Sequence, residues 1–447
     1  MALAPLTVDQ TLLPTGPKSF VRGPGVLERA IAALLIFIFS FSLPNEWFVR
    51  VGNASAGTVQ SGSPIVTLVF LAFFGFVIVS MNNNWHLVLA ASKREPLFPG
   101  LLGVIVLSSI WSINPVETFT SSVVLAITFA AGIYFTVRYR LEETLWLAGM
   151  AMASGVVINF VFIFVFQQFG LDTINVGTDG GSKWSGIFVT KNELGRVASL
   201  SFIIFGFLAR TRRSYFVWPF WGLLALIQVV GSDSATSLGA TGGIIGLTAI
   251  FLGFRGRKTL YGATALAITT VMSTLTALAA TNLAVATGLL GKDSNFTGRL
   301  PLWIDSWTIG IAGRPWFGYG WLAYWSEAES FPVRLRQNFA VPHAHNAFLD
   351  AWLFAGPIAA LLLFAIYARG MVWGARNIRA VPGAVGLAPI IFISYGFVFS
   401  LTESGVVRRD ISFILLVISC VTAAKNKGQR QRWVPPANKG VEAKQAL

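Results

Sequence analysis

Apolar segments of membrane-spanning length recur along this chain and constrain its fold more than any other feature. A helix needs about 20 apolar residues to cross roughly 30 Å of hydrocarbon. Of the 447 residues 54% are hydrophobic and 12% are charged, a composition outside the range of soluble globular domains. We therefore expect an all-α polytopic membrane protein with about twelve transmembrane helices, at 29–46, 63–81, 97–113, 116–137, 143–168, 192–210, 214–231, 234–254, 259–281, 346–368, 382–402 and 409–424.

The basic residues are distributed unevenly between alternate loops. The net charge of +14 would also suit a protein that binds nucleic acid. If the N-terminus is cytoplasmic, however, the cytoplasmic segments hold about 22 of the 33 Lys and Arg residues and about 6 of the 19 acids, which is the positive-inside bias of membrane proteins. We therefore expect both termini in the cytoplasm, the lipid bilayer as a partner, and no nucleic acid.

The predicted spans divide the chain into five segments. Most loops are short, and one external loop is long enough for a sizeable extramembrane unit. The segments are a cytoplasmic leader at 1–28, transmembrane helices 1–9 at 29–281, the large external loop at 282–345, transmembrane helices 10–12 at 346–424, and a basic cytoplasmic tail at 425–447. The single cysteine, Cys420, falls in the last span and cannot form an intramolecular disulfide.

The large external loop is predicted to contain an amphipathic helix. Trp303, Trp307 and Ile311 recur at helical spacing, and a helix with such a stripe would lie along the membrane interface and cover it as a lid. Pro301 disfavours helical geometry for the residue before it, so Leu300 is expected to be extended.

Two cations stand at the entrance to the sixth predicted span. Residues 186–196 read GIFVTKNELGR, which places Lys191 and Arg196 near the start of a helix. The unpaired N–H groups and positive dipole of a helix N-terminus favour a phosphate or diphosphate. Alternatively, Lys191 extends to the membrane interface and Arg196 pairs with Glu193 or a neighbouring helix.

A third candidate cation precedes the lid helix. Arg299 lies in the sequence TGRLPLW at 297–303, where its guanidinium could bind a diphosphate through two parallel hydrogen bonds. A solvated loop arginine explains the same pattern. Arg314, Arg334 and Arg336 share this loop, and composition does not rank them.

The segment VPHAHNAFLD at 341–350 contains two of the three histidines. It stands where the polar loop meets an apolar run, so His345 and Asn346 should open a helix. The positive end of a helix disfavours an imidazolium, and we expect His345 to be neutral and able to accept a proton. His343 is then a supporting or substrate-contacting residue. A capped helix entrance without catalysis remains the alternative.

A metal site is not expected from these residues. His-x-His alone offers two ligands, whereas a metal needs more. Asp350 is off the helical face of His345, and the remaining histidine, His86, falls on the cytoplasmic side of the predicted topology.

Together, cations for a diphosphate and one base on the external face suit glycosyl transfer from a lipid diphosphate donor. The leaving group of such a donor is already activated. The protein therefore has to stabilise its charge and to deprotonate an acceptor hydroxyl.

Several short motifs resemble the O-antigen ligase and Wzy-type polymerase superfamily, and within it the ExoQ-like exopolysaccharide polymerases. They run in the family's order over roughly residues 100–360: WSINPVET at 111–118, GIFVTKNELG at 186–195, TGRLPLW at 297–303, GYG at 318–320 and HAHN at 343–346. In place of a cleaner Gly-x-x-Gly after the histidine, the chain has GPIA at 356–359. This departure leaves the choice between ligase and polymerase open.

The resemblance implies a GT-C-like architecture in the bacterial inner membrane, with the large loop and the active site on the periplasmic face. By this resemblance His345 takes the place of the catalytic histidine, and Arg196 and Arg299 that of the diphosphate-binding arginines, helped by Lys191. Asn346 and His343 would act in support or on the acceptor side. The implied chemistry needs no cofactor and no metal, and the implied substrates are an undecaprenyl-diphosphate-linked glycan donor and a glycan acceptor.

Three functions are therefore weighed. The leading one is polymerisation of lipid-linked repeat units into an exopolysaccharide or O-antigen-like polysaccharide. The others are ligation of the glycan to lipid A core and, less favoured, a polysaccharide transporter or flippase. The sugar, the linkage, chain-length control, and any chain-length regulator or export partner stay open, as do the roles of the remaining external residues Glu327, Glu329, Glu403, Arg408 and Arg409, for which a solvated rim is the simplest interpretation.

Overall fold

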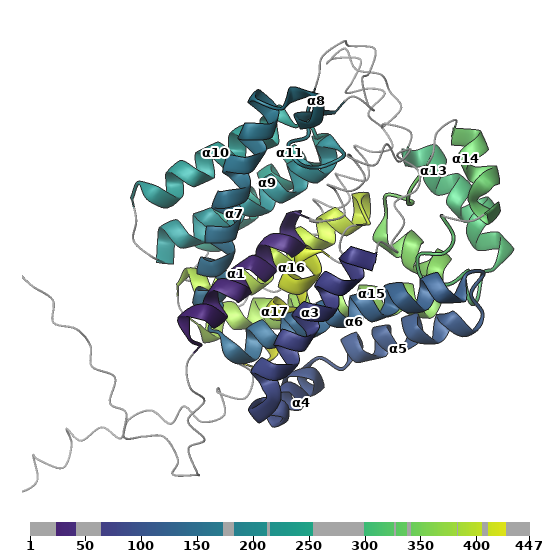
Figure 1. The fold of residues 1–447 in the computed structure, drawn as a ribbon, viewed down its shortest axis with the longest axis horizontal. Helices are drawn as coiled ribbons and strands as arrows, with labels where there is room; N and C mark the ends of the chain where they lie inside the picture. Colours follow the sequence, from purple (N-terminus) through teal and green to yellow (C-terminus); the bar gives the residue numbers. More distant parts are fainter. Residues whose placement is uncertain are drawn as a thin grey trace, which may run out of the picture.

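The computed structural model describes residues 24–41, 64–172, 183–211, 215–253, 299–325, 328–337, 341–381, 383–404 and 410–425. These residues are almost all helical (Figure 1). The longer helices are α1 (Val26–Phe41), α3 (Pro64–Met81), α4 (Trp85–Arg94), α5 (Leu97–Leu107), α6 (Pro115–Arg138), α7 (Leu141–Phe164), α9 (Lys191–Thr211), α10 (Val217–Gly231), α11 (Ala235–Gly253), α15 (Ala347–Ala380), α16 (Ala384–Thr402) and α17 (Ile411–Lys425). The shorter elements are η2 (Asn82–Asn84), η3 (Ser108–Ile110), α8 (Gln167–Gly170), α13 (Arg299–Asp305), η5 (Ser306–Ile311), η6 (Ala328–Ser330), α14 (Phe331–Gln337) and the strands β1 (Leu171–Asp172) and β2 (Lys183–Trp184).

Helices occupy all of the predicted spans that fall on described residues. Five of them, α6, α7, α9, α15 and α16, are long and apolar enough to cross a membrane, and the pair α3 and α4, bent by 108°, would make a sixth. The predicted ninth span, 259–281, lies outside the described residues. The protein is thus an all-α membrane protein, and the number of twelve spans stays a prediction.

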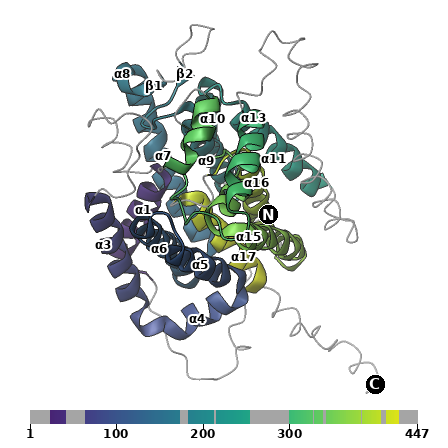
Figure 2. The same ribbon diagram turned by 90° about the vertical axis from the view of Figure 1, so that its right-hand side faces the viewer.

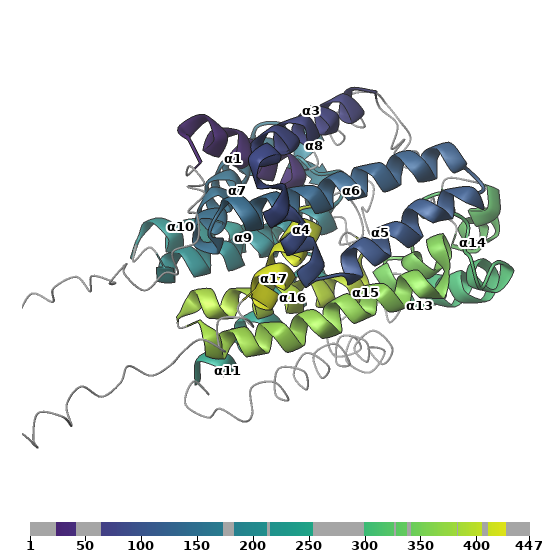
Figure 3. The ribbon, with the colours of Figure 1, turned by 90° about the horizontal axis from the view of Figure 1, so that it is seen from below.

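Helices α16 and α17 lie at the centre of the bundle (Figure 1). Both are apolar around their whole circumference, and a helix of that kind is stable only when other helices surround it. Helix α16 is the most enclosed of the five long spans, with α15 and α17 packed against it and α11 on another side. Helices α5, α6 and α15 run in similar directions along the molecule (Figure 3).

The remaining helices pack around this centre. Helix α9 packs on α10 and α7, and α7 packs on α1. Seen end-on, the two-residue strands β1 and β2 lie beside α8 at the edge of the bundle (Figure 2). Helices α9, α11, α15 and α17 begin, and α16 ends, at the end of the bundle that also carries α13 and α14; we call it the site end.

A helix is present at the position of the predicted lid, with two differences from the prediction. Leu300 is helical and not extended, because α13 begins at Arg299 and a proline is tolerated in the first helical turn, where its missing N–H would have no partner. The second half, η5, is a π-helix, which has more residues per turn than an α-helix. The stripe therefore rotates along the helix: Trp307 is exposed, but Ile311 is buried.

Helix α15 is broken within its candidate membrane span, Ala347–Ile378. Ala355 and Gly356 have non-helical backbone angles, and Gly356 has a φ of 80°. The break frees the carbonyls of Leu353 and Phe354, which accept hydrogen bonds of 2.8 Å each from the N–H groups of Tyr319 and Gly320. The glycine-rich turn at 318–320 thus replaces the next turn of the helix.

The segment at 111–118 holds this turn from the other side. The indole N–H of Trp111 donates to the carbonyl of Phe317, at 2.7 Å, and the N–H of Ile113 donates to that of Tyr319, at 3.0 Å. The Thr118 hydroxyl donates to the Trp321 carbonyl, at 3.2 Å. Two motifs about 200 residues apart are therefore parts of one support for the start of α15.

Replacing Gly356 with alanine tests this support. A Cβ atom there would lie 2.1 Å from the carbonyl oxygen of Trp316, and only glycine readily adopts this backbone conformation. We expect Gly356→Ala to destabilise the protein by about 2 kcal/mol or more, seen as a lower thermal midpoint in detergent. Gly206→Ala in α9 is the matched control, because a Cβ there meets nothing within 4 Å; equal midpoints for the two variants would contradict the role of the break.

Candidate active site

His345 sits in a tight turn immediately before α15. Asn346 caps the helix, because its side-chain oxygen accepts hydrogen bonds from the N–H groups of Phe348 and Leu349, at 3.0 and 3.1 Å. The Asn346 amide donates in turn to the carbonyl of Leu401, at 3.2 Å, and so ties this turn to the end of α16. The predicted helix start is confirmed. His345 itself adopts a left-handed conformation with a φ of 51°, which is uncommon for a residue other than glycine.

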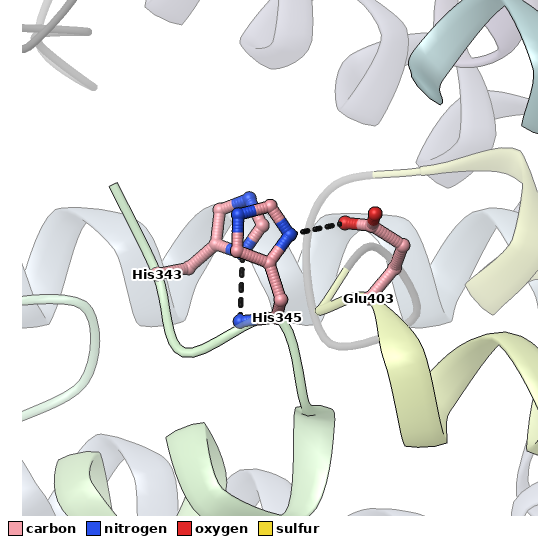
Figure 4. A group of neighbouring side chains, drawn as sticks. All are labelled: His343, His345 and Glu403. Carbon is pink, nitrogen blue, oxygen red and sulfur yellow. Dashed lines mark hydrogen bonds and ion pairs between the residues drawn. The ribbon is translucent and has the colours of Figure 1, made fainter. Parts of the chain in front are cut away.

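The His345 imidazole is bound to Glu403, which follows the last residue of α16. Nδ1 lies 3.0 Å from Oε2 of Glu403 (Figure 4). A carboxylate can only accept, so Nδ1 carries the proton of this bond in the neutral ring. Nε2 then bears the lone pair, and it is the nitrogen that can take a proton from a substrate.

Arg299 binds the other oxygen of the same carboxylate. Its Nη2 lies 2.7 Å from Oε1 of Glu403, and its Nη1 donates to the hydroxyl of Thr236, at 2.8 Å. Both charged side chains are largely buried. Burial by itself would raise the pKa of Glu403, but the charge of His345 when its ring is protonated, the charge of Arg299, the hydrogen bond from His345 and the charge of Arg196 hold it at about 2. Glu403 is therefore ionised throughout the physiological range.

Arg196 contributes to the electrostatics of this group from α9. Its guanidinium is paired with Asp410 at the start of α17 and lies 3.4 Å from the hydroxyl of Ser412. Its carbonyl accepts a hydrogen bond from the hydroxyl of Tyr395, at 2.6 Å. The pairing with a neighbouring helix, one of the two alternatives from the sequence, is thus present, and Arg196 is also close enough to lower the pKa of Glu403.

Lys191 lies in a different cluster. Its ammonium donates to the carbonyl of Asp233, at 3.4 Å, and its N–H donates to Asp172, at 3.0 Å. The side chain of Asp233 is paired with Lys183 of β2, at 2.7 Å. The structure thus brings Arg299, Arg196 and His345 together around Glu403. It places Lys191 beside the paired strands β1 and β2, which we call the hairpin.

His343 supports the turn that holds His345. Its Nδ1 accepts a hydrogen bond from the backbone N–H of His345, at 3.1 Å, and the two ring centroids are 4.0 Å apart. This contact stabilises the left-handed backbone of His345. Both rings point away from α15 (Figure 4).

The structure adds a potential third metal ligand that the sequence argument lacked. Among the described residues, ligand atoms of His343, His345 and Glu403 all lie within 4.8 Å of one another. However, these side chains are already hydrogen-bonded through His345, and Arg299 occupies the other oxygen of the carboxylate. A divalent cation would have to displace these bonds beside a positive charge.

Glu403 is the residue that sequence reasoning missed. Its interpretation as part of a solvated rim is wrong, because its side chain is only 12% exposed and carries two ionic contacts. Among the unranked arginines, Arg314 packs over the ring of Tyr319 and Arg336 pairs with Asp305. Arg334 lies on α14, and Glu329 is exposed. The remaining unranked residues, Glu327, Arg408 and Arg409, lie outside the described residues.

Comparisons with known proteins find matches over the middle of the chain. Residues 184–364 match the family model described as O-Antigen ligase, and the matched segment includes Arg196, Arg299 and His345. The chain is also 32% identical, over 233 residues, to the exopolysaccharide production protein ExoQ of Rhizobium meliloti (strain 1021). The alignment covers 47% of this chain and 50% of that protein, so the chain spans about half the length of the relative it matches. The resemblance drawn from the motifs is thereby confirmed: residues 184–364 of this multi-pass membrane protein are similar to the O-antigen ligase family, and about half of the chain is similar to ExoQ.

Proposed function

We propose that this protein is a glycosyltransferase of the bacterial inner membrane that polymerises undecaprenyl-diphosphate-linked repeat units on the periplasmic face. The acceptor is the hydroxyl of a second glycan. The site end would face the periplasm, in accordance with the distribution of positive charge along the sequence. The observation that carries this proposal is the contiguous arrangement of His345, Glu403 and Arg299.

The base would be His345. Glu403 fixes the ring and its tautomer through Nδ1, so Nε2 can accept the proton of the acceptor hydroxyl while the hydroxyl oxygen attacks the anomeric carbon. The carboxylate also stabilises the imidazolium that results. A positioned general base contributes typically about 10²-fold to 10⁴-fold to the rate.

The leaving group would be held by arginines. As the bond between the anomeric carbon and the phosphate oxygen breaks, the diphosphate keeps the electron pair, and its negative charge needs nearby cations. Arg299 lies against the same carboxylate as the base, and Arg196 acts on that carboxylate electrostatically. Lys191 is proposed as a more distant contact for the donor, because its own partners lie at the hairpin.

Ligation to lipid A core is the second candidate, because the matching family model is described as O-Antigen ligase. The name of the R. meliloti relative, an exopolysaccharide production protein, favours the polymerase. Transport is disfavoured by the position of the charged cluster. Transporters place ionisable groups near mid-membrane, whereas His345 and Glu403 lie just outside the ends of α15 and α16.

Replacing His345 with alanine tests the catalytic proposal. In the producing bacterium we expect His345→Ala to be folded and membrane-inserted but to lower polymer output by about 10²-fold or more, with single repeat units accumulating on the lipid carrier. Extracted lipid-linked oligosaccharides are measured by mass spectrometry. His86→Ala is the control, because this exposed residue lies on α4. Normal polymer from His345→Ala would refute the proposal, and finished chains that fail to reach lipid A would indicate the ligase.

The pH dependence tests the role of Glu403. Its pKa of about 2 lies below the ordinary value of 4.5, so its charge is present at every practical assay pH and is lost only as pH falls toward 2. In Glu403→Gln the imidazolium loses its stabilising anion, and we expect a lower rate with the acid limb of the rate profile moved down by about 1 pH unit or more. An exposed control, Glu329→Gln, should keep the wild-type profile; a wild-type profile in Glu403→Gln would count against the pairing.

Metal removal tests whether the chemistry is metal-independent. Arg299 already neutralises the charge of Glu403, which a divalent cation would otherwise do. We expect EDTA to leave the transfer rate of the purified protein unchanged, and elemental analysis to find no stoichiometric metal. A loss of activity in EDTA that zinc or magnesium restores would instead assign His343, His345 and Glu403 as metal ligands.

A further inference from the structure

One buried carboxylate binds a sequence neighbour of each residue in the proposed catalytic pair, His345 and Glu403. Asp350 is fully buried in α15. It accepts hydrogen bonds from the backbone N–H of Ala344, at 3.1 and 3.3 Å from its two oxygens, and from the hydroxyl of Ser404. Ala344 is the residue directly before His345, and Ser404 is the residue directly after Glu403.

The position of Asp350 in the helix explains this reach. Its own N–H donates to the carbonyl of Asn346, at 3.0 Å, so it belongs to the first complete turn of α15. Side chains on a helix point back toward its N-terminus, and that direction leads to the turn containing Ala344. A third donor, the indole N–H of Trp325, binds Oδ1 at 2.7 Å. Trp325 is not a sequence neighbour of His345 or Glu403.

We infer that Asp350 is a positioning residue that sets the distance between His345 and Glu403. The inference rests on the proposed function, in which that hydrogen bond orients the base. His345 and Glu403 are 58 residues apart in the chain and lie at the ends of two different helices. Asp350 connects these two helix ends, because it binds Ala344 next to His345 and Ser404 next to Glu403.

The acceptor-only chemistry of a carboxylate makes this connection specific. The donors at Ala344, Ser404 and Trp325 all require an acceptor, and an ionised aspartate offers two oxygens with about four lone-pair sites. An asparagine of the same shape offers one oxygen and turns an N–H₂ group toward the remaining donors. Asp350→Asn therefore loosens the two ends without creating a cavity.

The consequence should be seen in catalysis and not only in stability. A displacement of about 1 Å takes the 3.0 Å bond between His345 and Glu403 out of hydrogen-bonding range. Misplacement on that scale can cost on the order of 10²-fold in rate. It should also move the acid limb of the rate profile in the same direction as Glu403→Gln does.

Three variants of the full-length protein in lipid nanodiscs test the inference. The assay uses the lipid-linked repeat unit extracted from the producing bacterium. We expect Asp350→Asn and Ser404→Ala to lower kcat by about tenfold or more, with little change in KM and an acid limb at lower pH. Trp325→Phe is the matched control: it removes a hydrogen bond to Asp350 that does not involve a neighbour of His345 or Glu403, so its profile should match the wild type.

A second measurement does not depend on the reaction. The chain has three histidines, so His345 can be followed by ¹⁵N NMR of histidine-labelled protein. The chemical shift of its Nδ1 reports the hydrogen bond to Glu403 and should change in Ser404→Ala relative to the wild type and to Trp325→Phe. Unchanged Nδ1 shifts in both Ser404→Ala and Asp350→Asn would overturn the inference, as would an equal change in Trp325→Phe. Failure of the proposed function would appear separately, as transfer that does not need His345.

Discussion

The ionised carboxylate of Glu403 is the interaction on which the candidate site depends. A buried anion is strongly unfavourable unless charged or hydrogen-bonding partners surround it. Glu403 has one on each oxygen, Arg299 and His345, and both come from elements that are distant from α16 in the sequence. The carboxylate thus brings the start of α13 and the turn before α15 to the same point. Its position is fixed in turn by α16, the most enclosed of the five long spans, so a buried apolar helix places the most polar part of the site.

Features that depend on local sequence could be predicted, and those that depend on packing could not. Apolar length gave the helices, and the Asn346 cap gave the start of α15, because capping is decided within a few residues. Glu403 carries no such signal. At the end of an apolar helix it looks like any solvated acid, and only the approach of two other helix ends makes it a buried ion pair. The π-turn in the lid was missed for a related reason, since the spacing of Trp303, Trp307 and Ile311 suits an α-helix.

The packing also explains why short motifs far apart in the chain occur together. The segments at 111–118 and 318–320 contact each other through backbone and side-chain hydrogen bonds, and the second replaces the missing turn after Phe354. Gly356 provides the backbone angle at which α15 breaks. These hydrogen bonds hold the first turns of α15 in place. An explanation of such motifs as separate substrate-binding segments would miss this mechanical relation.

The break in α15 also affects how this helix can respond to the thickness of the bilayer. The part of α15 after the break, residues 357–380, would be about 36 Å long as a helix, longer than the roughly 30 Å of hydrocarbon. Such a span adapts to its membrane by tilting. In a continuous helix, a change in tilt would be transmitted to the residues before it, His345 among them. With the break at Gly356, a tilt of the later part would not have to move the turns before it, which the hydrogen bonds from Tyr319 and Gly320 hold.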